Sequence, residues 1–447
     1  MTATAVPRSD ALELAPTQTD PAEPAPALLP GLSQSACASG RSTACWRSRV
    51  ARSVTGLVAG RVPVDVLLPG GKVLGRPHRD MSRPAIEIHR PDAFFERLAH
   101  DPKVGIGEAY MAVDWSAAPG TDLGEALTPY AEQIRELLPV WMRKLRFLTD
   151  RRHSPEFRNT PDGARDNIEA HYDLSNEMFE TFLDETLSYS SGRFDPAVPY
   201  DEQLLEDAQV RKVHGLLDML GVGEGTRLLE IGTGWGFLAV EAALRGAEVV
   251  TITLSTEQAE YARERAEGAG VSGMVDIRLQ DYRDVTGTFD AVVSVEMIEA
   301  VGEEYWETYF AKIDEVLAPG GTAAIQAIVM DHDRYLTARR STGWINKHIF
   351  PGGMIPSLRA IEEELGRTTL QLAEVDLFGA DYAETLRRWR HTFIERWGRV
   401  QELGFDEVFR RRWEFYLAFC EAGFAGGAID VAWLRLDRLA GGSPDQR

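Results

Sequence analysis

The sequence predicts an α/β protein in which a doubly wound parallel sheet follows a small α+β domain. Two observations lead to this prediction. From Arg227 onward, short apolar runs with strand character alternate with helical stretches, which is typical of a parallel sheet covered by helices on both faces. The first run, residues 228–231, leads into Gly232, Gly234 and Gly236 and then into helical spacing. A strand, a tight turn and a helix in that order let the backbone approach a nucleoside ligand closely.

The composition indicates a globular protein with a sizeable core. Of 447 residues, 44% are hydrophobic and 26% are charged, and this length suits two to three domains. No apolar run approaches the roughly 20 residues that span a bilayer, and the N-terminus lacks the pattern of a secretory signal. Cys37, Cys45 and Cys420 have no metal-like spacing. We therefore expect a cytoplasmic protein without a disulfide framework or a metal site.

The net charge of −21 argues against general nucleic-acid binding, which favours a basic surface. Charge is nevertheless a local property. Residues 141–147 and 386–390 interleave cations with large apolar side chains, and such stretches could rest on lipid headgroups. They could equally be solvated helix faces with extended arginine side chains.

Four segments are predicted along the chain. Residues 1–45, rich in Ala, Pro, Thr and Ser, form a disordered leader. Residues 46–135 form the small α+β domain, in which no catalytic group of residues stands out. Residues 136–166 form a basic, aromatic connector, and residues 167–447 form the main domain, whose C-terminal third inserts helices.

Each domain has a predicted order of elements. In the small domain we expect a helix over 45–58, a hairpin of strands 64–68 and 72–74, a strand over 85–89, a helix over 91–98, and a turn at 105–110 that leads into Trp115. In the main domain the expected strands are 228–231, 249–254, 275–279, 291–295 and 322–328, the expected helices include 168–182, 204–220, 382–398 and 405–421, and the last segment is 428–436.

In an open parallel sheet the ligand lies beyond the carboxyl ends of the strands. Those ends carry Glu230–Gly236, Thr253–Gln258, Asp281–Tyr282 and Glu296–Glu299. A dinucleotide-binding protein normally has an acid after its second strand, whereas residues 251–255 contain none, which argues against NAD. Because a Ser and a Gln three residues apart also fit a helix capping box, Gln258 is either a ribose ligand or a cap.

The motifs around these strand ends resemble the cyclopropane-fatty-acid synthase family. The matching stretches, in the same order over roughly residues 85–430, are Ile168–Asn176, Phe182–Asp184, Tyr189–Ser190, Glu230–Gly236, Thr253–Gln258, Trp344–Lys347, Ile349–Gly353 and Tyr382–Leu386. The small domain also resembles that of the longer, phospholipid-acting members. The resemblance implies a Rossmann-like class I methyltransferase sheet, a C-terminal lipid-binding insertion, and transfer of a carbon from S-adenosylmethionine to an unsaturated acyl chain of a membrane lipid.

The resemblance also implies which positions surround S-adenosylmethionine. These are Tyr189, Ser190, Gly232, Gly234, Thr253, Leu254, Gln258 and Tyr282. The residue types suit the role, because glycines admit the methionine portion, and Tyr282 can cover the adenine face while Asp281 accepts a hydrogen bond from its amine. The alternative for Tyr282 is an ordinary place in the core.

The implied reaction needs a dry site, because an alkene is a poor nucleophile and its attack on a methyl donor leaves a carbocation that water would trap. Aromatic faces stabilise such a cation, and the candidates are Tyr172, Tyr382 and Phe350. Each of the three could instead be part of the core.

In the family, a bound bicarbonate is the proposed base that removes the final proton. Glu299 and Tyr382 fill two of its expected positions, Ser191 stands where the family has Cys, Gln326 stands where it has His, and Ala300 replaces the His that follows the family's Glu. Ser and Gln can still hydrogen-bond an oxyanion, so bicarbonate stays a candidate in an altered pocket.

This altered pocket leaves the product open. Proton loss from the added methyl closes a cyclopropane, whereas a hydride shift before proton loss gives a methylene branch, which a partner reductase could saturate to a methyl branch of the 10-methyl type. We expect a peripheral enzyme at the inner face of the membrane that acts on cis double bonds of phospholipid acyl chains. Double-bond position, headgroup and homo-oligomer formation stay open. The rival predictions are an amine N-methyltransferase of related fold and a non-catalytic lipid-binding protein.

Overall fold

A computed structural model describes residues 41–75, 83–133 and 175–439, with side chains from Trp46 onward. Most of the predicted leader, the predicted connector with its basic stretch 141–147, and Tyr172 lie outside the described residues. Cys45–Arg447 form one compact unit. Within the described residues, no helix has the length and apolar character needed to cross a membrane.

The main domain is built on a seven-stranded sheet with the order β10-β11-β9-β8-β5-β6-β7. Its strands are β5 (Arg227–Ile231), β6 (Glu248–Thr253), β7 (Val275–Leu279), β8 (Phe289–Val295), β9 (Leu317–Met330), β10 (Leu370–Leu377) and β11 (Ile429–Arg438). All five predicted strands are present, and β7, β6, β5, β8 and β9 pair in parallel. The chain winds outward from β5 to β6 and β7 and then returns to β8 on the other side, which creates a crevice at the carboxyl ends of β5 and β8.

The prediction of a wholly parallel sheet is wrong at one edge. β11 runs antiparallel to both β9 and β10, and β10 has no counterpart among the predicted strands. β10 is an edge strand in which most side chains are exposed, so it lacks the continuous apolar run by which buried parallel strands are found in a sequence. The antiparallel direction of β11 depends on how it pairs with its neighbours, so it cannot be predicted from the residues of β11 alone.

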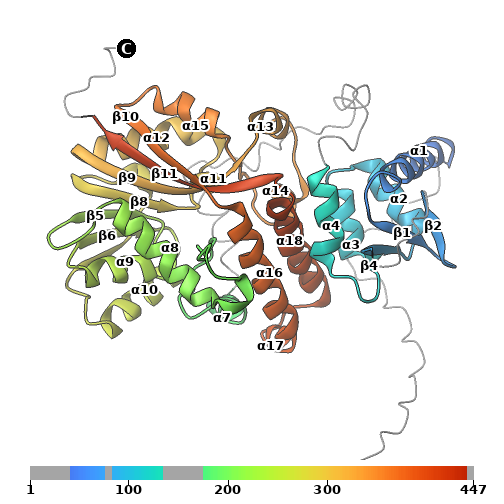
Figure 1. Ribbon diagram of the computed structural model, residues 1–447, viewed down its shortest axis with the longest axis horizontal. Helices are drawn as coiled ribbons and strands as arrows, with labels where there is room; N and C mark the ends of the chain where they lie inside the picture. The colour runs from blue at the N-terminus through green and yellow to red at the C-terminus, as the bar shows by residue number, and fades with distance from the viewer. Residues whose placement is uncertain (1–40, 76–82, 134–174, 440–447) are drawn as a thin grey trace, which may run out of the picture. The chain divides into compact units, whose positions relative to one another are not determined.

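Helices cover both faces of this sheet (Figure 1). α8 (Leu205–Met219), α9 (Phe237–Leu244) and α10 (Thr256–Gly268) lie on one side, and α12 (Trp306–Val316) and α15 (Leu358–Leu365) lie on the other. Consecutive strand residues point to opposite faces, so Leu228 enters the core under α8–α10 while Leu229 enters the core under α12 and α15. The doubly wound prediction is therefore confirmed by two separate apolar cores.

The small domain has its own four-stranded sheet in the order β2-β1-β3-β4. Its elements are α1 (Arg41–Ala59), β1 (Asp65–Leu68), β2 (Lys72–Leu74), β3 (Ala85–Ile88), α2 (Pro91–His100), α3 (Gly105–Met111), β4 (Trp115–Ala117) and α4 (Leu123–Glu132). The predicted hairpin is confirmed, since β1 and β2 pair antiparallel, and β3 adds to β1 in parallel.

The turn predicted at residues 105–110 is wrong, because this segment is the helix α3. A Cβ on Gly105 would overlap the carbonyl of Arg97, and one on Gly107 would overlap the indole of Trp344. These glycines are therefore present because two neighbours pack against the helix at close range, and not because the chain turns there. Closely packed helical glycines and turn glycines look the same in a sequence.

The C-terminal third inserts helices, as predicted. The predicted helix 382–398 is divided between α16 (Gly379–Glu395) and α17 (Trp397–Glu402), and the predicted helix 405–421 is α18 (Glu407–Ala425). The insertion also contains α13 (His332–Ala338) and α14 (Trp344–His348), for which no range was predicted. Short elements complete the main domain: α7 (Asn176–Glu180), η3 (Tyr200–Glu202), η4 (Tyr282–Asp284), α11 (Ile298–Val301) and η5 (Glu303–Tyr305). The predicted helix 168–182 is thus described only as α7, which ends at Glu180 rather than Phe182.

The apolar side chains of the stretch 386–390, one candidate for contact with lipid headgroups, are in the interior of the protein, whereas the Arg387 side chain is 42% exposed. Leu386, Trp389 and Arg390 on α16 are each at most 2% exposed. The Arg390 guanidinium forms ion pairs with Asp122 of α4 at 2.7 Å and with Glu421 of α18 at 2.8 Å. This arginine joins the helical insertion to the small domain, so the headgroup interpretation of this stretch is wrong.

Candidate active site

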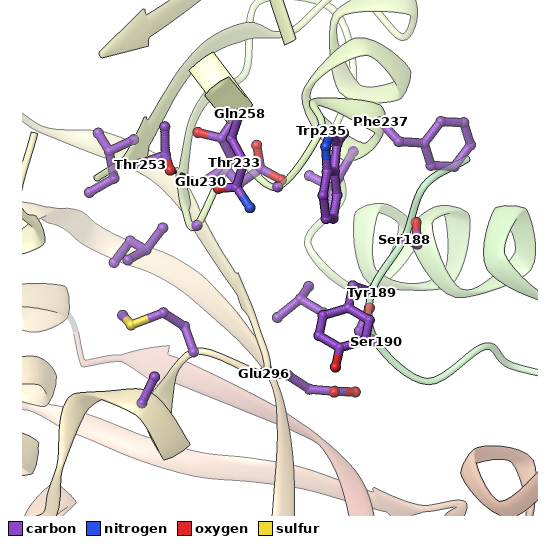
Figure 2. A pocket seen from close by; sticks show the side chains of 18 of the residues that line it. Ser188, Tyr189, Ser190, Glu230, Thr233, Trp235, Phe237, Thr253, Gln258 and Glu296 are labelled. Carbon is purple, nitrogen blue, oxygen red and sulfur yellow. Dashed lines mark hydrogen bonds between the residues drawn. The ribbon is translucent and has the colours of Figure 1, made fainter. Parts of the chain in front are cut away.

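A cavity of about 230 Å³ lies at the carboxyl ends of β5, β6 and β8. Its wall contains residues 230–235 of the glycine turn, the end of β6, residues 280–283, the segment after β8, residues 186–190 and Lys212 of α8. Figure 2 shows Glu230, Thr233, Thr253 and Gln258 gathered at one end, and Glu296 beside Tyr189 and Ser190 at the other. All nine positions predicted to surround S-adenosylmethionine, Asp281 included, line this cavity.

The glycine turn has the geometry that a close ligand requires. Gly232, Gly234 and Gly236 have φ angles of +104°, +51° and +82°, a region that residues with a Cβ rarely adopt. A Cβ on Gly234 would meet nothing within 4 Å, and one on Gly232 would meet only Met297 at 3.9 Å, so both glycines face open cavity space. Gly236 instead allows close packing, because its Cβ would lie 2.7 Å from Ala262 of α10.

Buried polar groups support the turn from below. The Thr251 hydroxyl lies 2.6 Å from Glu230 Oε2, to which it donates, and 2.7 Å from the Thr233 hydroxyl. Burial raises the pKa of Glu230 to about 8, although the Thr251 hydrogen bond opposes the rise. Because a buried acid gains from a nearby positive charge, this end of the cavity favours a cationic ligand such as the methionine portion of S-adenosylmethionine.

The structure separates the roles of Ser255 and Gln258. The Ser255 hydroxyl caps α10 by accepting from the Gln258 backbone N–H at 3.2 Å. The Gln258 side chain does not complete a capping box, because its Oε1 accepts from the Thr253 hydroxyl at 2.9 Å and the side chain lines the cavity. Ser255 therefore has a structural role, while Gln258 stays available to a ligand.

Asp281 and Tyr282 form the third wall. The Asp281 carboxylate binds Arg283 through both oxygens, at 2.8 and 2.6 Å, and these bonds lower its pKa despite the opposing effect of burial. The Tyr282 hydroxyl is buried without a hydrogen-bond partner among the described residues. An unpartnered buried hydroxyl is costly, and a ligand with a polar group at this wall would supply the missing bond.

Tyr189 and Ser190 connect the cavity to the helical insertion. The Tyr189 ring stacks on Trp389 with centroids 5.4 Å apart, and its hydroxyl lies 2.8 Å from that of Tyr416. The Ser190 hydroxyl accepts from the Lys212 ammonium at 2.7 Å. Burial lowers the pKa of Lys212 to about 8, and the charge of Glu296 opposes this decrease.

The opposite end of the cavity centres on Glu296, which the sequence analysis noted after β8 but did not select as a site residue. Its Oε1 accepts from the Ser191 backbone N–H at 2.9 Å and from Gln326 Nε2 at 2.7 Å. Its Oε2 accepts from the Tyr382 hydroxyl at 2.6 Å. Three residues predicted to hold an anion are therefore brought together around a carboxylate of the chain. We call Glu296, Ser191, Gln326 and Tyr382 the carboxylate cradle.

The remaining groups of the predicted bicarbonate pocket have other partners. The Ser191 hydroxyl donates to the Gly192 carbonyl at 2.9 Å, so Ser191 serves the cradle through its backbone. Gln326 Oε1 accepts from Trp433 Nε1 at 2.8 Å. Glu299 accepts from the Ile328 backbone N–H through one oxygen, and its other oxygen is buried without a hydrogen-bond partner in the described part of the chain. Burial and the nearby charge of Glu296 raise the pKa of Glu299 to about 8.

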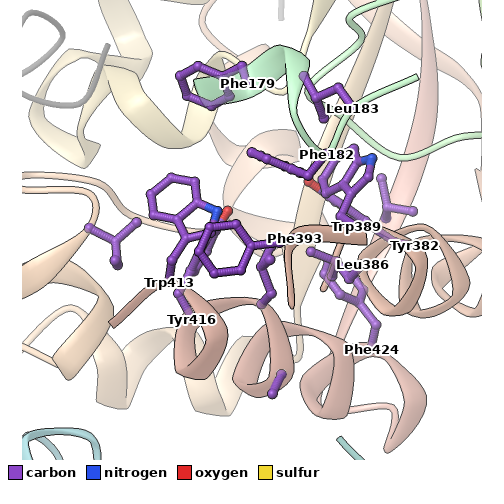
Figure 3. Close-up of a cluster of buried hydrophobic side chains, with 14 of the residues drawn as sticks. Phe179, Phe182, Leu183, Tyr382, Leu386, Trp389, Phe393, Trp413, Tyr416 and Phe424 are labelled. Atoms are coloured by element: carbon purple, nitrogen blue, oxygen red, sulfur yellow. The ribbon is translucent and has the colours of Figure 1, made fainter. Parts of the chain in front are cut away.

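Aromatic side chains from α16 and α18 and from residues 179–182 pack beside the cradle (Figure 3). The Tyr382 ring stacks on Phe424 with centroids 4.4 Å apart. Phe350, another candidate for cation stabilisation, meets Tyr416 edge-on at 5.8 Å. The cluster gives the inner end of the cavity an apolar, aromatic surround, which is the environment that the predicted carbocation needs.

Comparison with known proteins identifies the family. The sequence profile described as mycolic acid cyclopropane synthetase matches residues 159–434. The chain belongs to this family. It is accordingly an S-adenosylmethionine-dependent methyltransferase, and its strand order is that of the class I methyltransferase fold.

Two relatives and one solved structure show how far the similarity extends. Tuberculostearic acid methyltransferase UfaA1 of Mycobacterium tuberculosis is 46% identical over 384 residues, which cover 83% of this chain and 87% of that protein. Cyclopropane-fatty-acyl-phospholipid synthase of Escherichia coli is 34% identical over 354 residues, which cover 78% and 87%. The crystal structure of mycolic acid cyclopropane synthase CmaA1 complexed with SAH and CTAB has a TM-score of 0.56 at 27% identity and covers 61% of this chain and 98% of that one.

Sequence reasoning did not select Glu296, Glu230 and Lys212 as site residues. Glu296 stands three residues before Glu299, and one turn of helix would carry both acids to one face, so this spacing was the available signal. Glu230 belongs to the glycine motif but was treated only as the end of a strand. Lys212 lies in a helix of ordinary composition, and nothing local distinguishes it.

Proposed function

We propose that this enzyme transfers the methyl carbon of S-adenosylmethionine to the cis double bond of an unsaturated acyl chain in a membrane phospholipid. The observation that carries the proposal is one cavity with a polar, glycine-lined end and, at its other end, a carboxylate beside an aromatic cluster. The names of the relatives, a tuberculostearic acid methyltransferase and a cyclopropane-fatty-acyl-phospholipid synthase, support the substrate class.

The residues at the strand ends fit S-adenosylmethionine, because open space faces Gly232 and Gly234 while polar groups surround it. Gly232, Gly234 and Glu230 would hold the methionine portion, and Thr253 and Gln258 would hold the ribose. Leu254, Tyr282 and Asp281 would hold the adenine. When bound there, S-adenosylmethionine supplies a methyl group on a positively charged sulfur.

Residues of the enzyme then shield the carbocation on the acyl chain from water until it loses a proton. Attack by the alkene π electrons would form a bond from one alkene carbon to the methyl carbon and leave the other alkene carbon positive, while the methyl–sulfur bond breaks and its electron pair neutralises the sulfur. Tyr382 and Phe350 belong to the aromatic cluster beside this end of the cavity, where they help to exclude water. Their direct contact with the cation stays a prediction. Tyr172 stays a prediction, since it lies outside the described residues.

The product is a cyclopropane or a methylene branch, depending on which electron pair neutralises the cation. Direct proton loss from the new methyl closes the ring. A hydride shift followed by proton loss from that methyl gives a methylene branch, and saturation to a methyl branch then needs a hydride and a proton from a separate reductase. Bicarbonate as the proton acceptor stays a prediction, although the Ser191 backbone N–H, Gln326 and Tyr382 already donate to Glu296.

Association with the membrane surface is supported by α1. This helix exposes Trp46, Val50 and Leu57, which are 53%, 48% and 43% exposed, together with several arginines. Exposed apolar side chains among cations suit an interfacial helix on an anionic leaflet. Peripheral binding at the inner face of the membrane is therefore the localisation we propose.

Lipid analysis tests the proposal. A host that expresses the chain and receives methionine labelled in its methyl group is expected to gain labelled one-carbon additions in unsaturated phospholipid chains. A host expressing the Gly234→Leu variant at the same level is the control and should gain none. Absence of any one-carbon mass gain with the unmodified chain overturns the proposal. Cosedimentation with vesicles distinguishes a lipid enzyme from the rival amine methyltransferase, because only the former should bind them.

A further inference from the structure

The carboxylate cradle has the hydrogen-bond donors of an anion-binding site, and the anion that they bind is the side-chain carboxylate of Glu296. Three donors converge on Glu296: a backbone N–H from Ser191, an amide from Gln326 and a phenol hydroxyl from Tyr382. They come from the segment before α8, from β9 and from α16, so three distant parts of the fold build one site. Of the cradle residues and Glu299, only Glu296 lines the cavity. The three donor residues do not line it, and each instead binds the Glu296 carboxylate.

The backbone at Glu296 is also unusual. Its φ is +50°, a left-handed conformation that is unfavourable for a residue with a Cβ. Such conformations persist when the surroundings enforce them, and they cluster at functional sites. Here the conformation directs the carboxylate back into the cradle directly after β8, instead of along the strand.

The donors around the cradle favour Glu296 over Glu299 as the ionised member of this acidic pair. Burial raises the pKa of Glu296, and three hydrogen bonds and the positive charge of Lys212 oppose that rise. Glu299 has one hydrogen-bond donor from another residue, and burial together with the charge of Glu296 raises its pKa to about 8. With three donors against one, the geometry favours the negative charge on Glu296. Its Oε2 has a single donor among the described residues and keeps an acceptor position.

We propose that the Glu296 carboxylate replaces a bound bicarbonate and is itself the base that removes the final proton. This inference rests on the proposed function. A carboxylate and a bicarbonate ion present the same planar pair of oxygens to hydrogen-bond donors. A second anion in the cradle would have to displace Glu296 from all three donors and lie against a buried negative charge.

The step is balanced without another reactant. The C–H bond of the added methyl breaks, and its electron pair forms either the third bond of the cyclopropane ring or, after the hydride shift, the second bond of the methylene group. The proton goes to Glu296 Oε2, which becomes a neutral carboxyl, and release of that proton to water restores the carboxylate. The acyl chain loses its positive charge, and nothing is oxidised or reduced.

The experiment compares the full-length chain with Glu296→Gly and Glu296→Gln in sealed, bicarbonate-free buffer, using vesicles of unsaturated phospholipid and S-adenosylmethionine. Glycine opens the space of the side chain and also accepts the left-handed backbone. Glutamine fills that space but cannot take up the proton. Glu303→Gln is the matched control, because Glu303 also accepts from a tyrosine hydroxyl, that of Tyr335 at 3.0 Å, outside the cavity.

We expect the unmodified chain and Glu303→Gln to be fully active without bicarbonate and unchanged when it is added. Both Glu296 variants should lose at least 100-fold in turnover. Added bicarbonate should restore Glu296→Gly at least tenfold and should not restore Glu296→Gln. Calorimetry in the presence of S-adenosylhomocysteine should detect bicarbonate binding to Glu296→Gly alone, while the affinity of each variant for S-adenosylhomocysteine stays within threefold.

Two results would overturn the inference: bicarbonate binding to the unmodified chain, or turnover by Glu296→Gly that equals the unmodified chain without bicarbonate. If Glu296→Gly does not fold, the calorimetry on the unmodified chain and the turnover of Glu296→Gln still decide the question. Failure of the proposed function looks different. In that case no variant adds carbon to lipid, while bicarbonate still binds Glu296→Gly and not the unmodified chain, and the assignment of Glu296 to the anion position stands.

Discussion

The two ends of the cavity are built in different ways. The end at Gly232 and Gly234 is built around one continuous stretch of strand, turn and helix start, to which the end of β6 and residues 281–282 add side chains. The end at Glu296 is assembled from side chains of three separate segments, and its central residue adopts a backbone conformation that its sequence does not favour. The first end is local in the chain, and the second exists only in the folded protein.

This difference determines how each end fails. A side chain added at the glycine turn would fill the cavity space that the ligand needs. Substitutions there should therefore abolish ligand binding and leave the carboxylate cradle intact. An assembled cradle is damaged by removing one partner, so substitutions there should leave ligand binding intact and reduce turnover. The following four predictions test this separation, beginning with the largest expected effect.

Gly234→Leu is expected to reduce the affinity for S-adenosylhomocysteine at least 100-fold, which corresponds to about 2.7 kcal/mol, because its side chain would occupy the cavity. Gly270→Leu is the matched control, since Gly270 also has a positive φ, +73°, with nothing within 4 Å of a Cβ, but lies outside the cavity. Both variants should lose about 1–2 kcal/mol of stability from backbone strain. Equal affinities by calorimetry would show that the glycine turn does not face the ligand.

Tyr382→Phe is expected to lower turnover by about 10- to 100-fold, because it removes a charge-assisted hydrogen bond worth about 1.5–3 kcal/mol from Glu296. The affinity for S-adenosylhomocysteine should change less than twofold. Tyr335→Phe removes an equivalent tyrosine–glutamate bond outside the cavity and should leave turnover unchanged. Steady-state kinetics with both variants checks this, and a matching loss of affinity in Tyr382→Phe would contradict the separation of the two ends.

Glu230→Gln is expected to change how stability depends on pH. The folded protein holds the Glu230 proton up to a pKa of about 8, whereas the unfolded chain releases it near its ordinary value of about 4.3. Between these values the folded state binds more protons, so stability falls as pH rises, by at most about 1.4 kcal/mol per unit. The variant lacks this decrease.

Urea unfolding between pH 5 and pH 8 measures the effect. The stability of Glu230→Gln relative to the unmodified chain should increase steadily across this range and level off above pH 8. Glu315→Gln, at a glutamate whose side chain is 62% exposed, should run parallel to the unmodified chain. A Glu230→Gln curve that also runs parallel would mean that Glu230 is ionised at neutral pH.

Ser255→Ala is expected to have the smallest effect, a loss of about 1 kcal/mol of stability from the missing helix cap, with an affinity for S-adenosylhomocysteine within threefold. Ser357→Ala removes the equivalent cap of α15, which lies outside the cavity, and should cost a similar amount. Thermal unfolding with calorimetry compares the two. A much larger loss of affinity in Ser255→Ala would make Ser255 a ligand-binding residue.

Features that depend on neighbouring residues were predicted from the sequence, and features that depend on contacts between distant segments were not. The five parallel strands and the hairpin of the small domain were predictable, because each depends on a pattern within about ten residues. The nine positions that the family resemblance implies for the cosubstrate all line the cavity, and their contact with it stays a prediction. The edge strand β10 and the helix α3 were missed, since exposure and close packing are set by neighbours that are distant in the chain. The headgroup interpretation of 386–390 failed for the same reason, because Arg390 is buried by Asp122 and Glu421.

By itself the sequence determined the parallel strands and the position of the glycine turn, because local spacing decides where a strand ends and where a helix begins, and its resemblance to a family implied the methyl donor. It also supplied Ser191, Gln326 and Tyr382 as members of one pocket. Only the tertiary structure placed Glu296 among them. The partner of a buried polar group is chosen by packing between distant segments and by the cost of leaving that group unpaired, and no spacing along the chain records that choice.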